Sequence, residues 1–164
     1  GDPANATDQL TVSGPFTWTG GALDLGGHTI AEGGMTWSGG TLRGHTLDNK
    51  GVATLSGNVA AGFSNTCPVD CLNARINNAA GAMFDITADI SWDSLHRGDC
   101  NCAPPADVIN DGLFRKTGGS GTARLSANFN NNGTLEVNSG TLLVGGSFLN
   151  SGSGGSSTLR AGSM

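Results

Sequence analysis

A repeat of 19 residues is the feature that most constrains how this chain can fold. Residues 16–25 (FTWTGGALDL) align with residues 35–44 (MTWSGGTLRG) at an offset of 19 throughout, and Phe129 and Phe148 have the same spacing. Within each repeat, apolar and polar residues alternate before a glycine pair interrupts them, which is typical of short strands joined by tight turns. A fixed period of about 20 residues indicates a solenoid in which each repeat stacks on the next.

The repeat predicts an all-β chain with about three short strands in each coil. Residues 26–30 (GGHTI) and 43–47 (RGHTL) supply the third strand at an offset of 17, which places His28 and His45 at matching positions as an exposed pair. Connections between parallel strands of one sheet are right-handed in nearly all proteins. The expected fold is therefore a right-handed parallel β-solenoid, or β-helix, of roughly six coils.

The repeat is interrupted twice, at residues 58–75 and at residues 87–107. Both segments lack the regular spacing of apolar residues and glycines, so we expect them to be insertions that leave the solenoid. The whole chain, residues 1–164, is expected to be a single domain, because its length suits one. Residues 1–15 are polar and are expected to be an irregular lead-in or cap.

All four cysteines lie in these two insertions, as Cys-x3-Cys in the first and Cys-x-Cys in the second. Zinc sites usually use Cys-x2-Cys pairs, so we place metal binding and redox chemistry behind disulfide formation. Two cysteines one residue apart pair with each other only with difficulty, and each is expected to bond a cysteine of the other insertion. Either connectivity remains open for the four residues, which are Cys67, Cys71, Cys100 and Cys102.

Residues 76–146 carry a more specific pattern, in which N-x-G-T is followed by alternating apolar residues, S-G-T-L and a Gly-Gly pair. This pattern resembles the repeats of large secreted or surface-anchored bacterial proteins of the adhesin kind, whose passengers are parallel β-helices. The resemblance implies an extracellular or cell-surface protein with a structural or adhesive role and no catalysis. Such a protein is the building block of a surface fibre or filament, or a module of a larger adhesin.

Composition narrows the range of partners. Glycine accounts for 28 of 164 residues, and charged residues make up only 13%, about half the usual share. The net charge is −5 and the eight basic residues are scattered, so no basic face for nucleic acid is expected. No apolar run approaches the length of about 20 residues that spans a membrane, and no cofactor or metal is predicted. The start GDPANATDQL, without Met, indicates a processed or excised product.

A second class of function, carbohydrate binding or cleavage, depends on the second insertion. Asp89, Asp93 and His96 lie close together in the sequence, and a sugar hydrolase needs two carboxylates at a set separation. Trp92 is expected to be exposed beside them and is the best candidate for stacking on a surface glycan. Turns favour Asp for conformational reasons, so we expect this cluster to be a solvated loop rather than a catalytic site.

The alternation of the strands assigns several side chains to the interior or to the surface. Trp18 and Trp37 share the parity of their apolar neighbours, so a stack in the core is favoured over an exposed aromatic ladder. Lys116 aligns with Val137, an interior position, although a charged residue is expensive to bury. Either the alternation slips at Lys116 or this residue lies at the open end of a strand.

The ends of a solenoid leave backbone groups of the outermost strands without partners along the axis. Residues 149–164 (LNSGSGGSSTLRAGSM) show no atypical capping repeat, helix, proline or run of charge. We therefore expect the last coil to pair with the first coil of another copy, or with adjacent repeats of a longer chain, and we slightly favour the filament. The residues expected at this contact are Leu10, Val12, Phe16 and Leu159.

Overall fold

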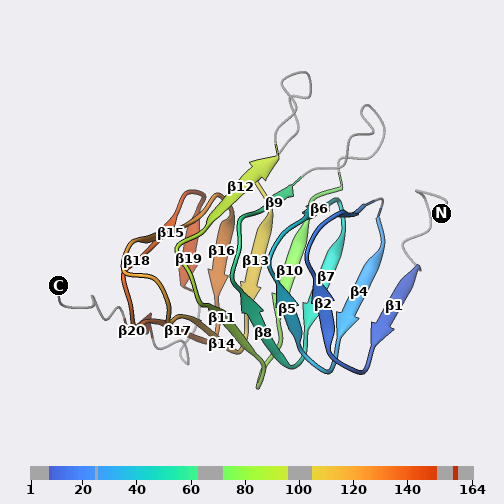
Figure 1. Ribbon diagram of the computed structural model, residues 1–164, viewed down its shortest axis with the longest axis horizontal. Helices are drawn as coiled ribbons and strands as arrows, with labels where there is room; N and C mark the ends of the chain where they lie inside the picture. The colour runs from blue at the N-terminus through green and yellow to red at the C-terminus, as the bar shows by residue number, and fades with distance from the viewer. Residues whose placement is uncertain (1–7, 25, 63–71, 96–104, 151–156, 159–164) are drawn as a thin grey trace.

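A computed structural model of the chain describes residues 8–24, 26–62, 72–95, 105–150 and 157–158. Within these ranges all regular structure is β, and no helix is present that is long and apolar enough to cross a membrane. The strands form three parallel sheets along the molecule, and the chain visits each sheet in turn (Figure 1). The predicted parallel β-solenoid with three short strands per coil is confirmed.

We name the sheets A, B and C in the order in which each coil enters them. Sheet A contains β1 (Gln9–Val12), β4 (His28–Ala31), β7 (Thr46–Asn49), β10 (Arg75–Asn78), β13 (Asp107–Asn110), β16 (Asn128–Asn131) and β19 (Phe148–Asn150). Sheet B contains β2 (Phe16–Trp18), β5 (Met35–Trp37), β8 (Val52–Leu55), β11 (Met83–Ile86), β14 (Leu113–Lys116), β17 (Thr134–Val137) and β20 (Ser157–Thr158). Sheet C contains β3 (Ala22–Leu23), β6 (Thr41–Arg43), β9 (Val59–Gly62), β12 (Ser91–Leu95), β15 (Thr122–Leu125) and β18 (Thr141–Val144).

Coils one to six each carry a strand in every sheet, and β19 and β20 belong to a seventh coil within the described ranges. The 19-residue repeat sets the register of the first two coils, because Phe16 pairs with Met35 and Trp18 pairs with Trp37. Later coils keep the same stacking although the spacing of equivalent residues rises to 29 and then to 32. In the chain, the extra residues fall between a strand of sheet C and the next strand of sheet A, and the described strands on either side keep their register.

The interior is filled by columns of apolar side chains that contribute one residue per coil. The rings of Trp18 and Trp37 stack at 4.8 Å, which confirms their predicted place in the core. The rings of Phe84 and Phe114 stack at 5.0 Å in the same way. Burying one large apolar side chain contributes roughly 1.5–3 kcal/mol, so these columns bind each coil to its neighbours.

The two insertions are shorter than the sequence predicted. Val59–Gly62 and Ser91–Leu95 are strands of sheet C, and they pair with each other inside the solenoid. Strand β9 was not predicted because Ala and Gly make up most of it, so Val59 is the only large apolar residue that indicates a strand there. Arg75 and Asp107, at the ends of the predicted insertions, begin strands of sheet A. Residues 63–71 and 96–104 lie outside the described residues, and so do all four cysteines.

The N-terminal segment also contains more structure than expected. Residues 1–15 were predicted to be irregular, but Gln9–Val12 forms β1, an edge strand of sheet A that pairs with β4. The polar residues Gln9 and Thr11 point outward and Leu10 and Val12 point inward, which is the ordinary alternation of a strand with one solvated face. A strand of only four residues gives too short a pattern to stand out in a polar sequence.

The third strand of the first coils is displaced by one residue from the predicted alignment. His28 pairs with Thr46, not with His45, so the expected exposed pair of histidines is wrong. His45 instead lies at the corner before β7, where its ring packs over Gly27. A side chain at Gly27 would place its Cβ 2.7 Å from His45 Cε1, so the glycine makes room for the ring. A slip of one residue exchanges the two faces of a strand, and it buries this histidine.

Candidate functional site

The predicted carbohydrate-binding cluster is not assembled by the fold. Trp92, expected to be exposed, is 0% exposed and packs its ring against Trp37 at 5.3 Å. The reason is its register, because Trp92 pairs with Val59 and therefore points into the solenoid. Asp93 faces outward and accepts a hydrogen bond from Ser91, while His96 lies outside the described residues. The described residues thus offer no exposed aromatic beside these carboxylates.

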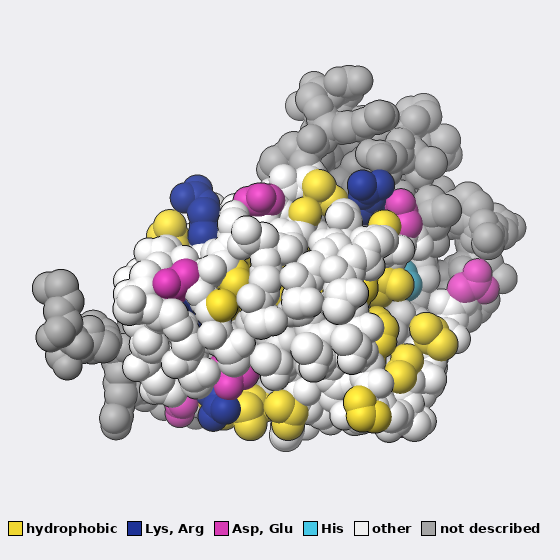
Figure 2. Space-filling model, in the orientation of Figure 1, with side chains coloured by type: hydrophobic (Ala, Val, Ile, Leu, Met, Phe, Trp, Pro, Cys, Tyr) yellow, Lys and Arg dark blue, Asp and Glu magenta, His cyan; other side chains and the backbone are white. Residues whose placement is uncertain are grey.

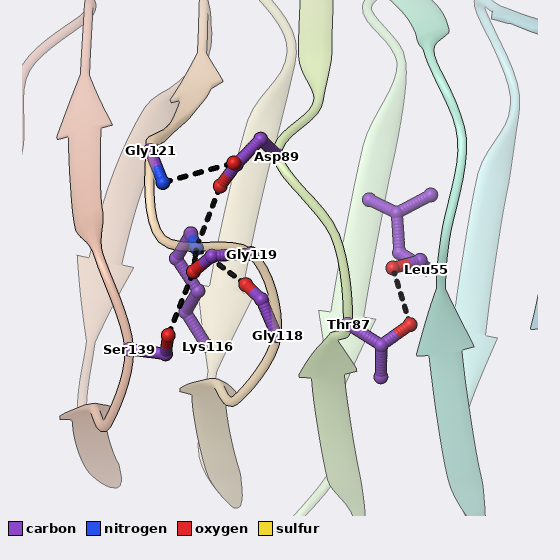
Figure 3. Close-up of polar contacts among 8 residues, drawn as sticks. All are labelled: Leu55, Thr87, Asp89, Lys116, Gly118, Gly119, Gly121 and Ser139. Carbon is purple, nitrogen blue, oxygen red and sulfur yellow. Dashed lines mark hydrogen bonds and ion pairs between the residues drawn. The ribbon is translucent and has the colours of Figure 1, made fainter.

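Asp89 is engaged in a polar corner between sheets B and C. Its carboxylate accepts hydrogen bonds from Lys116 Nζ at 3.0 Å and from the backbone N–H of Gly121 at 2.9 Å (Figure 3). The hydrogen bond from Lys116, followed by the one from Gly121, holds the pKa of Asp89 below its usual value. A carboxyl with a lowered pKa stays ionised at neutral pH, so it is a poor general acid.

Lys116 is the other half of this corner, and its side chain is fully buried. It occupies the interior position predicted by the alignment with Val137, with which it pairs, so the alternation does not slip. Its Nζ also donates to the carbonyls of Gly118 at 2.5 Å and Gly119 at 2.9 Å (Figure 3). Three oxygens therefore surround the ammonium group, which explains how a charge is tolerated in an apolar column.

A second carboxylate, Asp85, lies on the outer face of sheet B and is equally occupied. It forms an ion pair with Arg115 at 2.8 Å and accepts a hydrogen bond from Thr117 Oγ1 at 2.7 Å. Asp85 and Asp89 are thus each paired with a cation from the next coil. The arrangement ties neighbouring coils together through ion pairs.

The two histidines have separate environments. His28 Nε2 lies 2.8 Å from the carboxylate of Asp48 on the outer face of sheet A. His45 is 7% exposed, and its Nε2 lies 2.9 Å from Thr29 Oγ1. Burial, and after it repulsion from His28, lowers the pKa of His45. Among the described residues no group of three or more His, Cys, Asp or Glu side chains is arranged to hold a metal ion.

A column of asparagines inside sheet A is the feature that the sequence analysis missed. Asn49, Asn78, Asn110 and Asn131 are fully buried, one above the other in successive coils, and the column continues to Asn150. Each Nδ2 donates to the Oδ1 of the next coil at 2.8, 2.7, 2.6 and 3.1 Å in turn. A recurring N-x-G, present at four of these five positions, was the available signal.

The asparagine column also secures the turn between sheets A and B. Asn49 Nδ2 donates to the carbonyl of Met83, and Asn78 and Asn110 make the equivalent bonds to Leu113 and Thr134. Each side chain therefore connects its own coil to the following one through both side-chain and backbone acceptors. Buried amides that satisfy one another in this way fix the stacking register of the coils.

The interior columns are open to solvent at both ends of the described solenoid. Leu10 on β1 is 54% exposed and Phe148 on β19 is 45% exposed, although both belong to the column that is buried in coils between them. Figure 2 shows hydrophobic side chains gathered at the end that carries β1. Of the other residues predicted for self-association, Val12 and Phe16 are half-buried at this end and Leu159 lies outside the described residues.

No protein-family model, curated protein or solved structure matches this chain. The fold therefore stands on the strand order and register alone, and the likeness to adhesin repeats stays an interpretation of the sequence pattern.

Proposed function

We propose that this chain is a non-catalytic, right-handed β-solenoid module of an extracellular structural or adhesive protein, and that it works by stacking end to end on further coils. The observation that carries the proposal is the exposure of Leu10 and Phe148, which continue a buried column to both ends. Both residues lie on edge strands, and the unpaired backbone groups of a strand edge are a template for another strand.

The surface of the solenoid supports a structural role rather than a catalytic one. The carboxylates Asp85 and Asp89 are held by Arg115 and Lys116 of the next coil, where they tie coils together. The outer face of sheet A carries similar ties, such as the bond from Asn77 to Asp48 at 2.7 Å. Side chains that are fully engaged in connecting coils are those expected of a rigid rod or spacer.

We further propose that disulfides join the two insertions. Gly62 pairs with Leu95 where the chain leaves the solenoid, and Asn73 donates to the carbonyl of Pro105 at 2.9 Å where it returns. The insertions therefore start and end side by side, which suits bonds between their cysteines. Non-reducing peptide mapping tests this, and four free thiols or stoichiometric zinc would refute it.

Sedimentation velocity of the full chain over a range of concentrations tests the stacking itself. We expect concentration-dependent association, with elongated particles in electron micrographs. Leu10→Lys and Phe148→Lys should each weaken it, because a charge then faces the apolar edge of the neighbour. Thr36→Lys is the matched control, since Thr36 is exposed on the outer face of sheet B in the second coil, outside the apolar columns that reach the ends. A chain that stays monomeric in every form, at every concentration, contradicts the proposal.

A further inference from the structure

The asparagine column gives the solenoid a direction. From Asn49 to Asn131, each side chain donates through Nδ2 to the Oδ1 of the coil that follows. Asn150 receives such a bond from Asn131 at 3.1 Å and lies on β19, the last strand of sheet A in the described part. If the column continued, Asn150 Nδ2 would donate to a hydrogen-bond acceptor at the same position in the next coil along the axis.

The N-terminal edge of the chain does not supply that acceptor. In the register of sheet A, the position of the asparagine column is occupied by Val12 in the first coil and by Ala31 in the second. A second copy stacked in this register would set Val12 against Asn150. The amide would then be covered by an apolar side chain and left without a partner, which is unfavourable.

We propose that the C-terminal edge of the solenoid binds most tightly a strand that carries Asn in the register of the column, and that the first coil of an identical copy is a weaker partner. The fitting occupant is a further N-x-G coil of the kind formed by residues 128–146. The inference rests on the end-on stacking proposed above and names its partner.

Two properties make this edge selective. The exposed apolar residues Phe148 and Leu149 attract many strands, whereas the amide of Asn150 discriminates between them. A single buried asparagine that must find its counterpart is a known means of fixing register and partner in helical assemblies. The same physics applies here, because a mismatched strand buries an unpaired polar group and a matched strand extends an existing chain of hydrogen bonds.

The first experiment converts the N-terminal edge from a weaker partner into a matching one. Val12→Asn creates the sequence Asn-Ser-Gly at residues 12–14, which copies the N-x-G pattern on the N-terminal edge. We expect this variant to self-associate about tenfold more tightly than the unaltered chain in sedimentation velocity. Thr11→Asn, on the outward face of the same strand, is the matched control and should leave association unchanged. In the double variant with Asn150→Val, the gain should disappear.

A second measurement does not depend on altering the chain. Two peptides, one copying residues 127–146 and one carrying Asn131→Val in that sequence, are titrated against the labelled chain by fluorescence anisotropy. We expect the asparagine peptide to bind about tenfold more tightly.

The outcomes separate the two proposals. If Val12→Asn and the unaltered chain associate equally, or both peptides bind equally, end-on stacking stands and the selective role of Asn150 is overturned. If no form associates and neither peptide binds, the end-on stacking fails together with this inference.

Discussion

Two interior columns of this solenoid bury polar groups by different means. The asparagine column repeats one amide in successive coils, and each amide is the partner of the next. The column that runs from Trp18 to Val137 is apolar except at Lys116, whose charge is met by Asp89 and by two backbone carbonyls of its own turn. A repeated polar group thus depends on the same group in the coils above and below it, whereas the solitary lysine depends on its own turn and on one carboxylate of the preceding coil.

The largest effect is expected when the asparagine column is cut in the middle. Asn110→Leu keeps the number and branching of the side-chain heavy atoms but removes the amide donor from Asn131 Oδ1 and from the carbonyl of Thr134. Asn78 Nδ2 then keeps only the carbonyl of Leu113 as an acceptor in the following coil. Each orphaned buried group costs about 1–3 kcal/mol, so the free energy of unfolding should fall by about 3–5 kcal/mol. Urea denaturation measures this loss of stability. Asn77→Leu, on the outer face of sheet A, is the control and should cost about 1 kcal/mol or less. Equal losses for the two variants would contradict the difference between the columns.

A smaller effect is expected at the solitary lysine, and it should depend on shape more than on charge. Lys116→Met keeps most of the volume, removes a charge that is costly to bury, and leaves Asp89 able to reach water. It should cost about 1 kcal/mol, mainly for the carbonyl of Gly118, since Gly119 still accepts from Ser139 Oγ. Lys116→Ala opens a cavity and should cost about 3 kcal/mol. A loss for Lys116→Met that matched the loss for Lys116→Ala would show that the charge itself is needed.

The smallest expected effect is a dependence of stability on pH. Because the pKa of His45 is lowered in the folded chain from 6.5, the unfolded chain binds a proton first as the pH falls. Stability should therefore be complete above about pH 6.5 and decrease below it, until the folded form is protonated as well. Denaturation at pH 7 and pH 5 measures the slope, which His45→Gln should reduce. An unchanged slope in that variant would place its origin elsewhere.

The sequence predicted the features that repeat, because repetition reveals both strand parity and stacking. The pairing of Trp18 with Trp37 followed directly from the alignment of repeats. The alignment also matched Lys116 correctly with Val137, but it did not predict that the lysine is fully buried. The predictions failed where contacts between coils, rather than the local pattern, determine whether a side chain is buried. The one-residue slip at His45 depends on room above Gly27, and Trp92 is buried because β12 pairs inside sheet C.

The asparagine column was missed although its pattern was present in the sequence. N-x-G was interpreted as a turn signal, which it also is, since Asn131 Nδ2 donates to the carbonyl of Gly133. Whether such an amide lies inside or outside is decided by the parity of its strand. Applying the alternation of β16 to Asn131, two residues after the buried Phe129, would have placed it in the interior.

Hydrogen exchange of the asparagine side-chain amides, measured by NMR on the unaltered chain, tests the central claim most directly. We expect the side-chain protons of Asn78 and Asn110 to exchange at least about 100-fold more slowly than those of Asn77, because only the former lie in the buried column. Asn150, at its exposed end, should exchange rapidly and become protected when the matching coil peptide is added. Exchange at Asn110 as fast as at Asn77 would contradict the account, since the coils would then be stacked without a continuous chain of amides.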